Sequence, residues 1–278
     1  MEESKHIIWL ASYPKSGNTW FRAILAYLYR NESFDINNLD ISPIYSSRTF
    51  IENEAGIDTT ELTPSEAEEL RLSVFEQTAG KYPSFFKIHD AFTYLTGSRP
   101  IIPVNKTSAA VYFIRNPLDV AVSFAYHSAK TVEKTIENMG NENFFLASSQ
   151  KKYNNQFRQL LLNWSGHVQS WTGHSFFPVK VLRYEDMLAD PHRIFSETLC
   201  DFLHLPFQPK DISEAVEACR FDNLSRMEKE KGFREKAPGC EAFFRKGVAG
   251  DYKNHLSNEM IESVIRDHSS VMKQYKYL

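Results

Sequence analysis

The sequence predicts an α/β fold, a single domain over residues 1–278 with a central, mostly parallel sheet flanked by helices. Three observations support this prediction. Short apolar runs that suit buried strands alternate with segments whose apolar residues recur every three or four positions, as in amphipathic helices. Strands separated by helices imply parallel strands joined by helical crossovers. Lysine, histidine, arginine and tyrosine side chains also follow the predicted strands, at the sheet edge where such folds bind ligands.

The first predicted elements are a strand over 7–10, a loop over 11–17 and a helix that ends near Arg30. A helix N-terminus carries partial positive charge and free N–H groups, so this loop suits an anion. The loop differs from a Walker A motif, because Lys15 precedes Gly17 instead of following it. The predicted buried face of the helix comprises Trp20, Phe21, Ile24, Leu25 and Leu28.

The next part of the chain alternates between loops and predicted elements. Residues 31–62 are mixed in character, and we expect mostly loop there, with short helical pieces. A helix is predicted over 63–78, because the residues Thr-Pro-Ser-Glu form a capping box at its start. Strands follow over 84–89 and 109–114, and the second is apolar throughout, as in strands buried on both faces. Asn116 and Pro117 then begin another helix.

The second half is predicted to be mostly helical. Residues 128–153 are polar and irregular, and we interpret them as a flexible insertion. Residues 155–171 are predicted to form one helix and residues 179–184 a fourth strand. A helix is expected to start at residues 190–191, and two short helices are expected to follow over 211–219 and 223–230. Ser257 is expected to cap a last helix over 258–274.

Composition argues against several classes of protein. A net charge of −3 and a pI near 6.3 argue against general nucleic-acid binding, which needs a basic face. No apolar run is as long as a membrane span, and the N-terminus MEESKH lacks the apolar core of a signal peptide. Cys200, Cys219 and Cys240 are widely spaced and show no metal-site pattern. We therefore expect free thiols in a reducing, cytoplasmic environment.

Three motifs resemble those of the PAPS-dependent sulfotransferases, where PAPS is 3′-phosphoadenosine 5′-phosphosulfate. Residues 13–20, YPKSGNTW, resemble the family's 5′-phosphosulfate loop YPKSGTTW, with Asn18 in place of the first Thr. Residues 115–123 match the 3′-phosphate element RNPxDxxxS. Residues 245–254 resemble RKGxxGDWKN, with Tyr252 where Trp is common. The resemblance covers nearly the whole chain and implies the P-loop-kinase-like sulfotransferase fold. Within the family, the chain resembles the cytosolic-type enzymes and the bacterial small-molecule sulfotransferases.

The resemblance also implies how the cofactor PAPS is bound. The 5′-phosphate would lie on the loop amides, the 3′-phosphate would lie between the second and third motifs, and the adenine would stack between Trp20 and Phe221. Lysines and helix amides would supply the positive charge, so no metal is expected. The implied cofactor-binding residues are Lys15, Ser16, Gly17, Asn18, Thr19, Trp20, Arg115, Ser123, Tyr184, Phe221, Arg245, Lys246 and Gly247.

A fourth segment, residues 86–89, resembles the strand that carries the family's catalytic histidine, with a lysine two residues earlier. Residues i and i+2 of a strand point to the same face, so Lys87 and His89 can serve one site. The resemblance implies an in-line transfer of a sulfuryl group to a hydroxyl. His89 would take the acceptor proton, Lys15 would stabilise the leaving 5′-phosphate, and Lys87 would hold the sulfuryl oxygens.

The sequence leaves the acceptor and the oligomeric state open. Residues 31–62, 90–103 and 124–153 are rich in aromatics, which favours a small hydroxylated acceptor such as a phenol, an alcohol or a secondary metabolite. A glycan sulfotransferase is the alternative within the family. A nucleotide-dependent, kinase-like phosphotransferase is a weaker alternative, because the Walker A order and a Mg²⁺-binding acidic pattern are missing. A non-catalytic nucleotide-binding module is disfavoured, because Lys15, Lys87 and His89 are all present.

Overall fold

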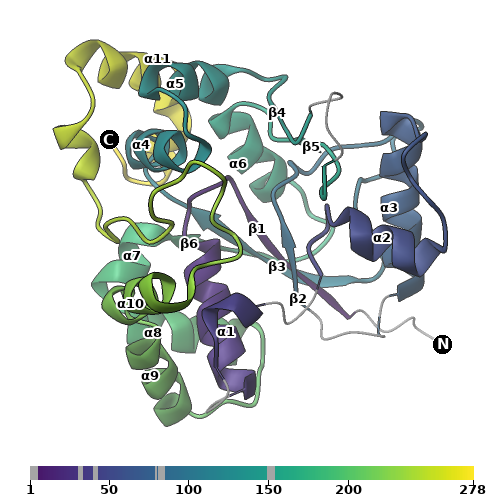
Figure 1. The fold of residues 1–278 in the computed structure, drawn as a ribbon, viewed down its shortest axis with the longest axis horizontal. Helices are drawn as coiled ribbons and strands as arrows, with labels where there is room; N and C mark the ends of the chain where they lie inside the picture. Colours follow the sequence, from purple (N-terminus) through teal and green to yellow (C-terminus); the bar gives the residue numbers. More distant parts are fainter. Residues whose placement is uncertain (1–5, 31–33, 40–42, 79, 81–84, 149–153) are drawn as a thin grey trace. The chain divides into compact units, whose positions relative to one another are not determined.

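A computed structural model of the chain describes residues 6–30, 34–39, 43–78, 80, 85–148 and 154–278 (Figure 1). The chain forms two compact units, each assembled from three separate stretches of sequence. The first unit comprises residues 1–13, 42–112 and 141–181. The second unit comprises residues 14–41, 113–140 and 182–278.

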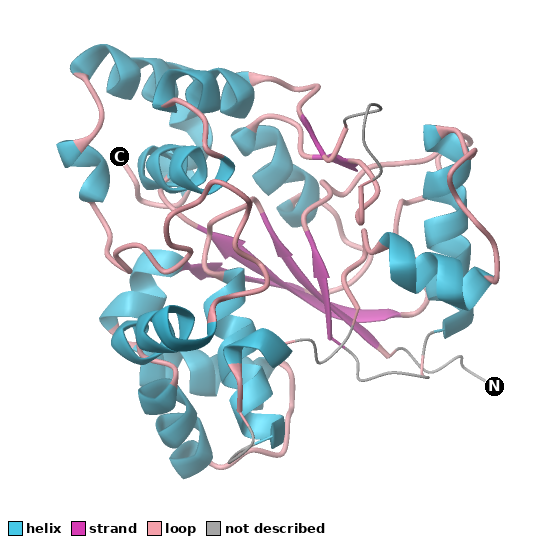
Figure 2. Ribbon diagram, in the orientation of Figure 1, coloured by secondary structure: helices cyan, strands magenta, loops and turns pink. Residues whose placement is uncertain are grey.

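The first unit contains the central sheet, whose strands lie in the order β2-β1-β3-β6. These strands are β1 (Ile7–Ser12), β2 (Phe85–Ile88), β3 (Thr107–Ile114) and β6 (Val179–Arg183). β1 and β2 run parallel with Leu10 opposite Lys87, and β1 is buried at every position, as its inner place requires. The last residues of β3 and β6 belong to the second unit. Helices flank the sheet (Figure 2), so the predicted α/β class is confirmed. The predicted strand start at Ser84 lies outside the described residues.

Three helices and a small hairpin complete the first unit. They are α2 (Arg48–Ala55), α3 (Pro64–Thr78), α6 (Trp164–Thr172) and the antiparallel pair β4 (Phe145–Leu146) and β5 (Gln159–Leu160). The predicted capping box of α3 is present: Thr63 N donates to Glu66 Oε2 at 2.8 Å, and Glu66 N donates back to Thr63 Oγ1. Trp9 of β1 packs against Tyr45, Phe75 and Phe86 in the core.

The secondary structure predicted for residues 128–153 and 155–171 is wrong. Residues 128–153 are not an irregular insertion, since they contain α5 (Val132–Gly140) and β4; residues 149–153 lie outside the described part. The apolar residues of α5, Val132, Ile136 and Met139, recur at spacings of four and three, a short helical pattern that sequence reasoning missed among the polar residues around it. Residues 155–171 are not one helix, because Leu162 has a φ of 58°, which no right-handed helix contains. Asn163 then caps α6 by accepting from Gly166 N at 2.6 Å.

The second unit is helical. Its α-helices are α1 (Asn18–Arg30), α4 (Pro117–Ser128), α5, α7 (Tyr184–Ala189), α8 (Pro191–Ser196), α9 (Pro209–Ala218), α10 (Phe221–Lys231) and α11 (Asn258–Gln274). A π-helical turn (Glu197–Phe202) extends α8, and 3-10 turns cover Ile36–Asn38 and Asp251–Asn254. α1 and α8 pack against α9, whereas α4, α5 and α11 pack together (Figure 1).

Side-chain caps set several helix starts in the second unit. The predicted caps at Asn116 and Ser257 are present, accepting from Leu118 N and Met260 N respectively.

The prediction that Tyr184 ends a strand is wrong, because β6 stops at Arg183 and Tyr184 opens α7.

Candidate functional site

The loop between β1 and α1 has a backbone shape that suits few residues. Lys15 has a φ of 68° and Gly17 a φ of 105°, both in the left-handed region. A Cβ on Gly17 would lie 2.7 Å from the Met187 side chain and 3.0 Å from the Tyr184 ring, so glycine is required there. Gly17 O accepts from Trp20 N at 3.0 Å and starts α1. A helix N-terminus presented by a strained loop is a suitable anion site.

Buried polar atoms around this loop have no hydrogen-bond partner. They are Ser16 Oγ, Trp20 Nε1 and Arg115 Nε, all in the second unit. Burying such a group without a partner is unfavourable, so a bound group that completes the hydrogen bonds is the natural explanation. A phosphate-bearing ligand offers acceptor oxygens of the kind that these donors need. The residues present therefore fit the phosphates of PAPS.

Arg115 connects the three motifs of the second unit. Its Nη1 donates to Lys15 O of the loop at 3.3 Å, and its Nη2 donates to Val248 O at 2.9 Å. Its guanidinium carbon lies 4.3 Å from the centre of the Tyr184 ring. Arg115 thus contacts both the loop and the third motif, and their joint role in binding the cofactor stays a prediction. Ser123 lies in α4, the helix that follows Arg115.

The third motif is held in place by two aspartates. Asp119 of α4 accepts from Gly250 N at 2.7 Å and from Tyr252 N at 3.0 Å. Asp251 accepts from Arg245 at 2.6 Å and from Lys246 at 2.7 Å. Burial raises the pKa of Asp251, but the hydrogen bonds from Lys246, Arg245 and Asn254 together lower it by more, so its pKa lies well below the usual range. Two cations thus lie together on a segment that is anchored to α4.

The predicted adenine-site residues have well-defined neighbours. A Cβ on Gly247 would overlap the Phe221 ring, so Gly247 allows the third motif to lie flat against that ring. Trp20 packs edge-on against Phe195, with ring centres 5.4 Å apart. Stacking of adenine between Trp20 and Phe221 stays a prediction. The Lys15 ammonium lies 3.7 Å from the centre of the Phe243 ring, a cation–π contact that sequence reasoning missed.

Lys87 and His89 lie in the first unit, on β2 and directly after it. His89 Nδ1 lies 2.7 Å from Ser12 O, the last residue of β1, and 3.3 Å from Ser12 Oγ. A carbonyl oxygen only accepts, so Nδ1 carries the proton, and the lone pair of the neutral imidazole is on Nε2. Lys87 is half-buried between buried neighbours, as expected for the face that it shares with His89.

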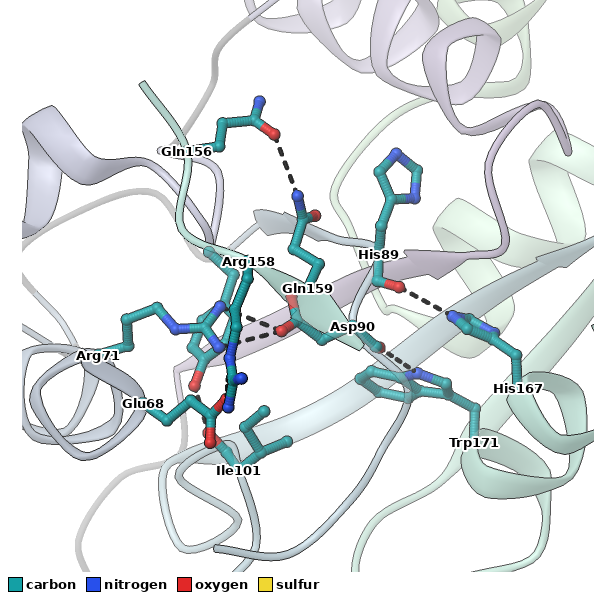
Figure 3. Close-up of polar contacts among 11 residues, drawn as sticks. Glu68, Arg71, His89, Asp90, Ile101, Gln156, Arg158, Gln159, His167 and Trp171 are labelled. Atoms are coloured by element: carbon teal, nitrogen blue, oxygen red, sulfur yellow. Dashed lines mark hydrogen bonds and ion pairs between the residues drawn. The ribbon is translucent and has the colours of Figure 1, made fainter. Parts of the chain in front are cut away.

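His167 of α6 holds the main chain at His89 (Figure 3). Its Nε2 donates to His89 O at 3.0 Å, and its Nδ1 accepts from Tyr112 OH at 2.7 Å. Burial lowers the pKa of His167 to about 4, so the ring is neutral at physiological pH. Sequence reasoning missed His167, because a lone histidine in a helical segment carries no distinguishing signal.

His167 gives a testable pH dependence. Its pKa is about 4 in the folded protein but 6.5 when unperturbed, so the unfolded chain binds the proton more tightly. Stability should therefore fall as the pH drops from 6.5 to 4, by about 3 kcal/mol from this group. A His167→Gln variant keeps a donor for His89 O but does not titrate. Urea unfolding at several pH values should show a correspondingly flatter profile for this variant, and equal profiles would contradict the assignment. The exposed His192→Gln is the control.

Comparison with known proteins identifies the family. A family model described as "Sulfotransferase domain" matches residues 5–276. The chain belongs to this family. The predicted resemblance to the PAPS-dependent sulfotransferases and the predicted enzyme class are thereby confirmed.

Similar curated sequences are sulfotransferases from plants and a mammal. The chain is 28% identical to flavonol 3-sulfotransferase of Flaveria bidentis over 92% of its own length and 78% of that protein. It is 28% identical to cytosolic sulfotransferase 7 of Arabidopsis thaliana, covering 90% and 74% respectively. It is 26% identical to the amine sulfotransferase of Oryctolagus cuniculus, covering 96% and 81%.

Solved structures share the fold of this sulfotransferase. One is retinol dehydratase in complex with androsterone and the inactive cofactor PAP, with a TM-score of 0.63, 19% identity, and coverage of 98% of this chain and 82% of that chain. Another is a mouse sulfotransferase complexed with PAP, with a TM-score of 0.60, 18% identity, and coverage of 98% and 86%. These likenesses confirm the predicted sulfotransferase fold.

No helix in the described ranges is long and apolar enough to cross a membrane. The same residues hold no group of three or more His, Cys, Asp or Glu side chains arranged to bind a metal ion. The expectations that no metal and no nucleic acid take part in the reaction stay predictions.

Proposed function

We propose that this sulfotransferase moves a sulfuryl group from PAPS to a hydroxyl of a small-molecule acceptor in the cytoplasm, with His89 as the base. The observation that carries the proposal is the position of Arg115, in contact with the loop that precedes α1 and with the segment that contains Arg245 and Lys246. One ligand with two phosphate positions accounts for both groups of residues, because each group brings its own donors and positive charge.

The chain's own residues suggest how the cofactor would be held. The amides of residues 16–20 at the start of α1 and the unpartnered Ser16 hydroxyl suit the 5′-phosphate. Arg115, Ser123 and residues 245–247 suit the 3′-phosphate, and Tyr184 and Phe221 suit the adenosine. When bound, PAPS supplies an activated sulfuryl group whose transfer leaves adenosine 3′,5′-bisphosphate. Lys15 would neutralise the charge that develops on the 5′-phosphate side.

His89 has the tautomer that a base needs. The hydrogen bond to Ser12 O places the proton on Nδ1, so the lone pair lies on Nε2, which would accept the proton of an attacking hydroxyl. Ser12, which contacts the His89 ring, precedes Lys15 of the cofactor loop by three residues in the sequence. Lys87, two residues before His89, would hold the sulfuryl oxygens as charge develops on them.

The names of related proteins support a small acceptor. Two of the relatives are named flavonol sulfotransferases, one of Flaveria bidentis and one of Flaveria chlorifolia. A flat phenolic or alcoholic acceptor agrees with the aromatic segments of the sequence. Several relatives are named cytosolic, which supports the proposed cytoplasmic location.

Two measurements test the proposal. A panel of phenols, alcohols and glycans is incubated with enzyme and PAPS, and products are identified by the mass gain of one sulfuryl group. We expect turnover with small hydroxylated compounds; turnover with glycans alone would make the enzyme a glycan sulfotransferase.

Calorimetry then compares the binding of adenosine 3′,5′-bisphosphate with the binding of ATP·Mg²⁺. Tighter binding of ATP·Mg²⁺ would contradict the proposal and favour a kinase-like activity.

A further inference from the structure

A buried ion pair lies directly beside His89 (Figure 3). Arg71 of α3 and Asp90, the residue after His89, each have side chains that are 1% exposed. Both terminal nitrogens of Arg71 donate to Asp90 Oδ1 at 3.1 Å. Burial raises the pKa of Asp90, an effect that Arg71 opposes. Burial lowers the pKa of Arg71, but Asp90, Tyr45 and Glu68 together raise it more, so the net pKa of Arg71 is above its ordinary value.

Stability does not explain a charged pair at this place. Removing two charges from water is costly, and apolar residues of the same volume often serve equally well or better. This pair is also incompletely satisfied, because Asp90 Oδ2 and Arg71 Nε are buried and have no hydrogen-bond partner. A charged pair does provide directional hydrogen bonds, which fix the course of the chain in a way that apolar contacts cannot.

The main chain at His89 is held from two helices. From α6, His167 Nε2 donates to His89 O and Trp171 Nε1 donates to Asp90 O, each at 3.0 Å. From α3, Arg71 holds the Asp90 side chain. The carbonyls of His89 and Asp90 and the Asp90 side chain are therefore fixed. The imidazole itself is oriented by β1 through Ser12 O. Figure 3 shows the His89 ring pointing away from these anchors.

We propose that Arg71 and Asp90 are positioning residues for His89. Their hydrogen bonds hold the chain after β2 so that the imidazole meets Ser12 O through Nδ1 and keeps its lone pair on Nε2. The inference rests on the proposed role of His89 as the base. Without the pair, the chain after His89 loses its anchor to α3, the imidazole rotates more freely, and both tautomers become populated. A fraction of the enzyme then presents an N–H group to the acceptor instead of a lone pair.

The decisive variant replaces both partners, Arg71→Met with Asp90→Leu, because single replacements leave a buried charge without a partner. Each single variant should melt several degrees below the wild type, and the double variant should regain most of that loss. The double variant should nevertheless show a kcat at least about 10-fold lower, since the base is misoriented, with KM for PAPS unchanged within about 2-fold.

An independent readout is the tautomer of His89 itself. Two-bond ¹H–¹⁵N correlation spectra of histidine-labelled protein distinguish a protonated ring nitrogen from one with a lone pair, and His89→Gln assigns the signal. The wild type should show the Nδ1–H form alone, and the double variant should show a mixture. A double variant that keeps both the wild-type kcat and a single tautomer would overturn the inference and leave the pair a purely structural feature.

Controls separate this inference from the proposed function. Lys134→Gln with Glu137→Gln removes an exposed ion pair on α5 and should change neither kcat nor the His89 signal. If His89→Gln keeps full activity, the proposed base is wrong, whatever the Arg71 and Asp90 variants do. If the double variant does not fold, Arg71→Met takes its place, because it removes both donors to Asp90 and the buried carboxyl can then take up a proton. In folded Arg71→Met, a mixed tautomer supports the inference and a single Nδ1–H tautomer overturns it.

Discussion

Replacing His89 with alanine should lower kcat for sulfuryl transfer by a factor of about 10²–10⁴, the usual contribution of a positioned base. The physical reason is that Nε2, left with a lone pair by the hydrogen bond between Nδ1 and Ser12 O, is lost as proton acceptor. The affinity for adenosine 3′,5′-bisphosphate should change little, because His89 is not among the residues proposed to bind the nucleotide. Initial rates with a productive acceptor and calorimetric titration of the nucleotide measure the two effects.

A matched control is His192→Ala. His192 is exposed on α8 and pairs only weakly with Glu217, at 3.5 Å, so its loss should leave kcat unchanged. Near-wild-type turnover of His89→Ala with the true acceptor would remove His89 from the mechanism. A parallel loss of nucleotide affinity would instead indicate that His89 acts mainly in binding.

Replacing Lys15 with methionine should lower kcat by a factor of about 10²–10³, the usual effect of deleting one group that stabilises transition-state charge. Methionine keeps the length of the side chain and its contact with the Phe243 ring, but removes the ammonium group that lies 3.7 Å from the ring centre. The charge on the bridging oxygen of the leaving group increases mainly in the transition state. The loss should therefore appear in kcat more than in KM for PAPS. Steady-state kinetics over a range of PAPS concentrations separates the two constants.

Lys15→Arg and Lys210→Met complete this experiment. Arginine keeps the charge and should recover part of the lost rate. Lys210 is 85% exposed on α9, so its loss should have no effect. An effect of Lys15→Met on KM alone would show that Lys15 serves binding and not departure of the leaving group.

Local sequence patterns predicted the parts of the fold that local chemistry decides. The capping box before α3 and the caps at Asn116 and Ser257 satisfy backbone N–H groups within three residues, so they are readable from the sequence. The apolar run over 109–114 predicted a buried strand, since a strand composed only of apolar residues is typical of the sheet interior. Where the pattern misled, at residues 155–171, a single left-handed residue, Leu162, interrupted an apparently helical periodicity.

By itself, the sequence determined the family and the fold class, because the motifs that carry the resemblance are short segments that can be read locally. It also predicted the residues proposed to carry the chemistry. Only the tertiary structure decided how those residues are supported. Arg115 donates to Lys15 O, 100 positions earlier, and to Val248 O, 133 positions later. His89 is oriented by Ser12, 77 positions earlier. Such contacts depend on which distant segments the fold brings together, and no local pattern records them.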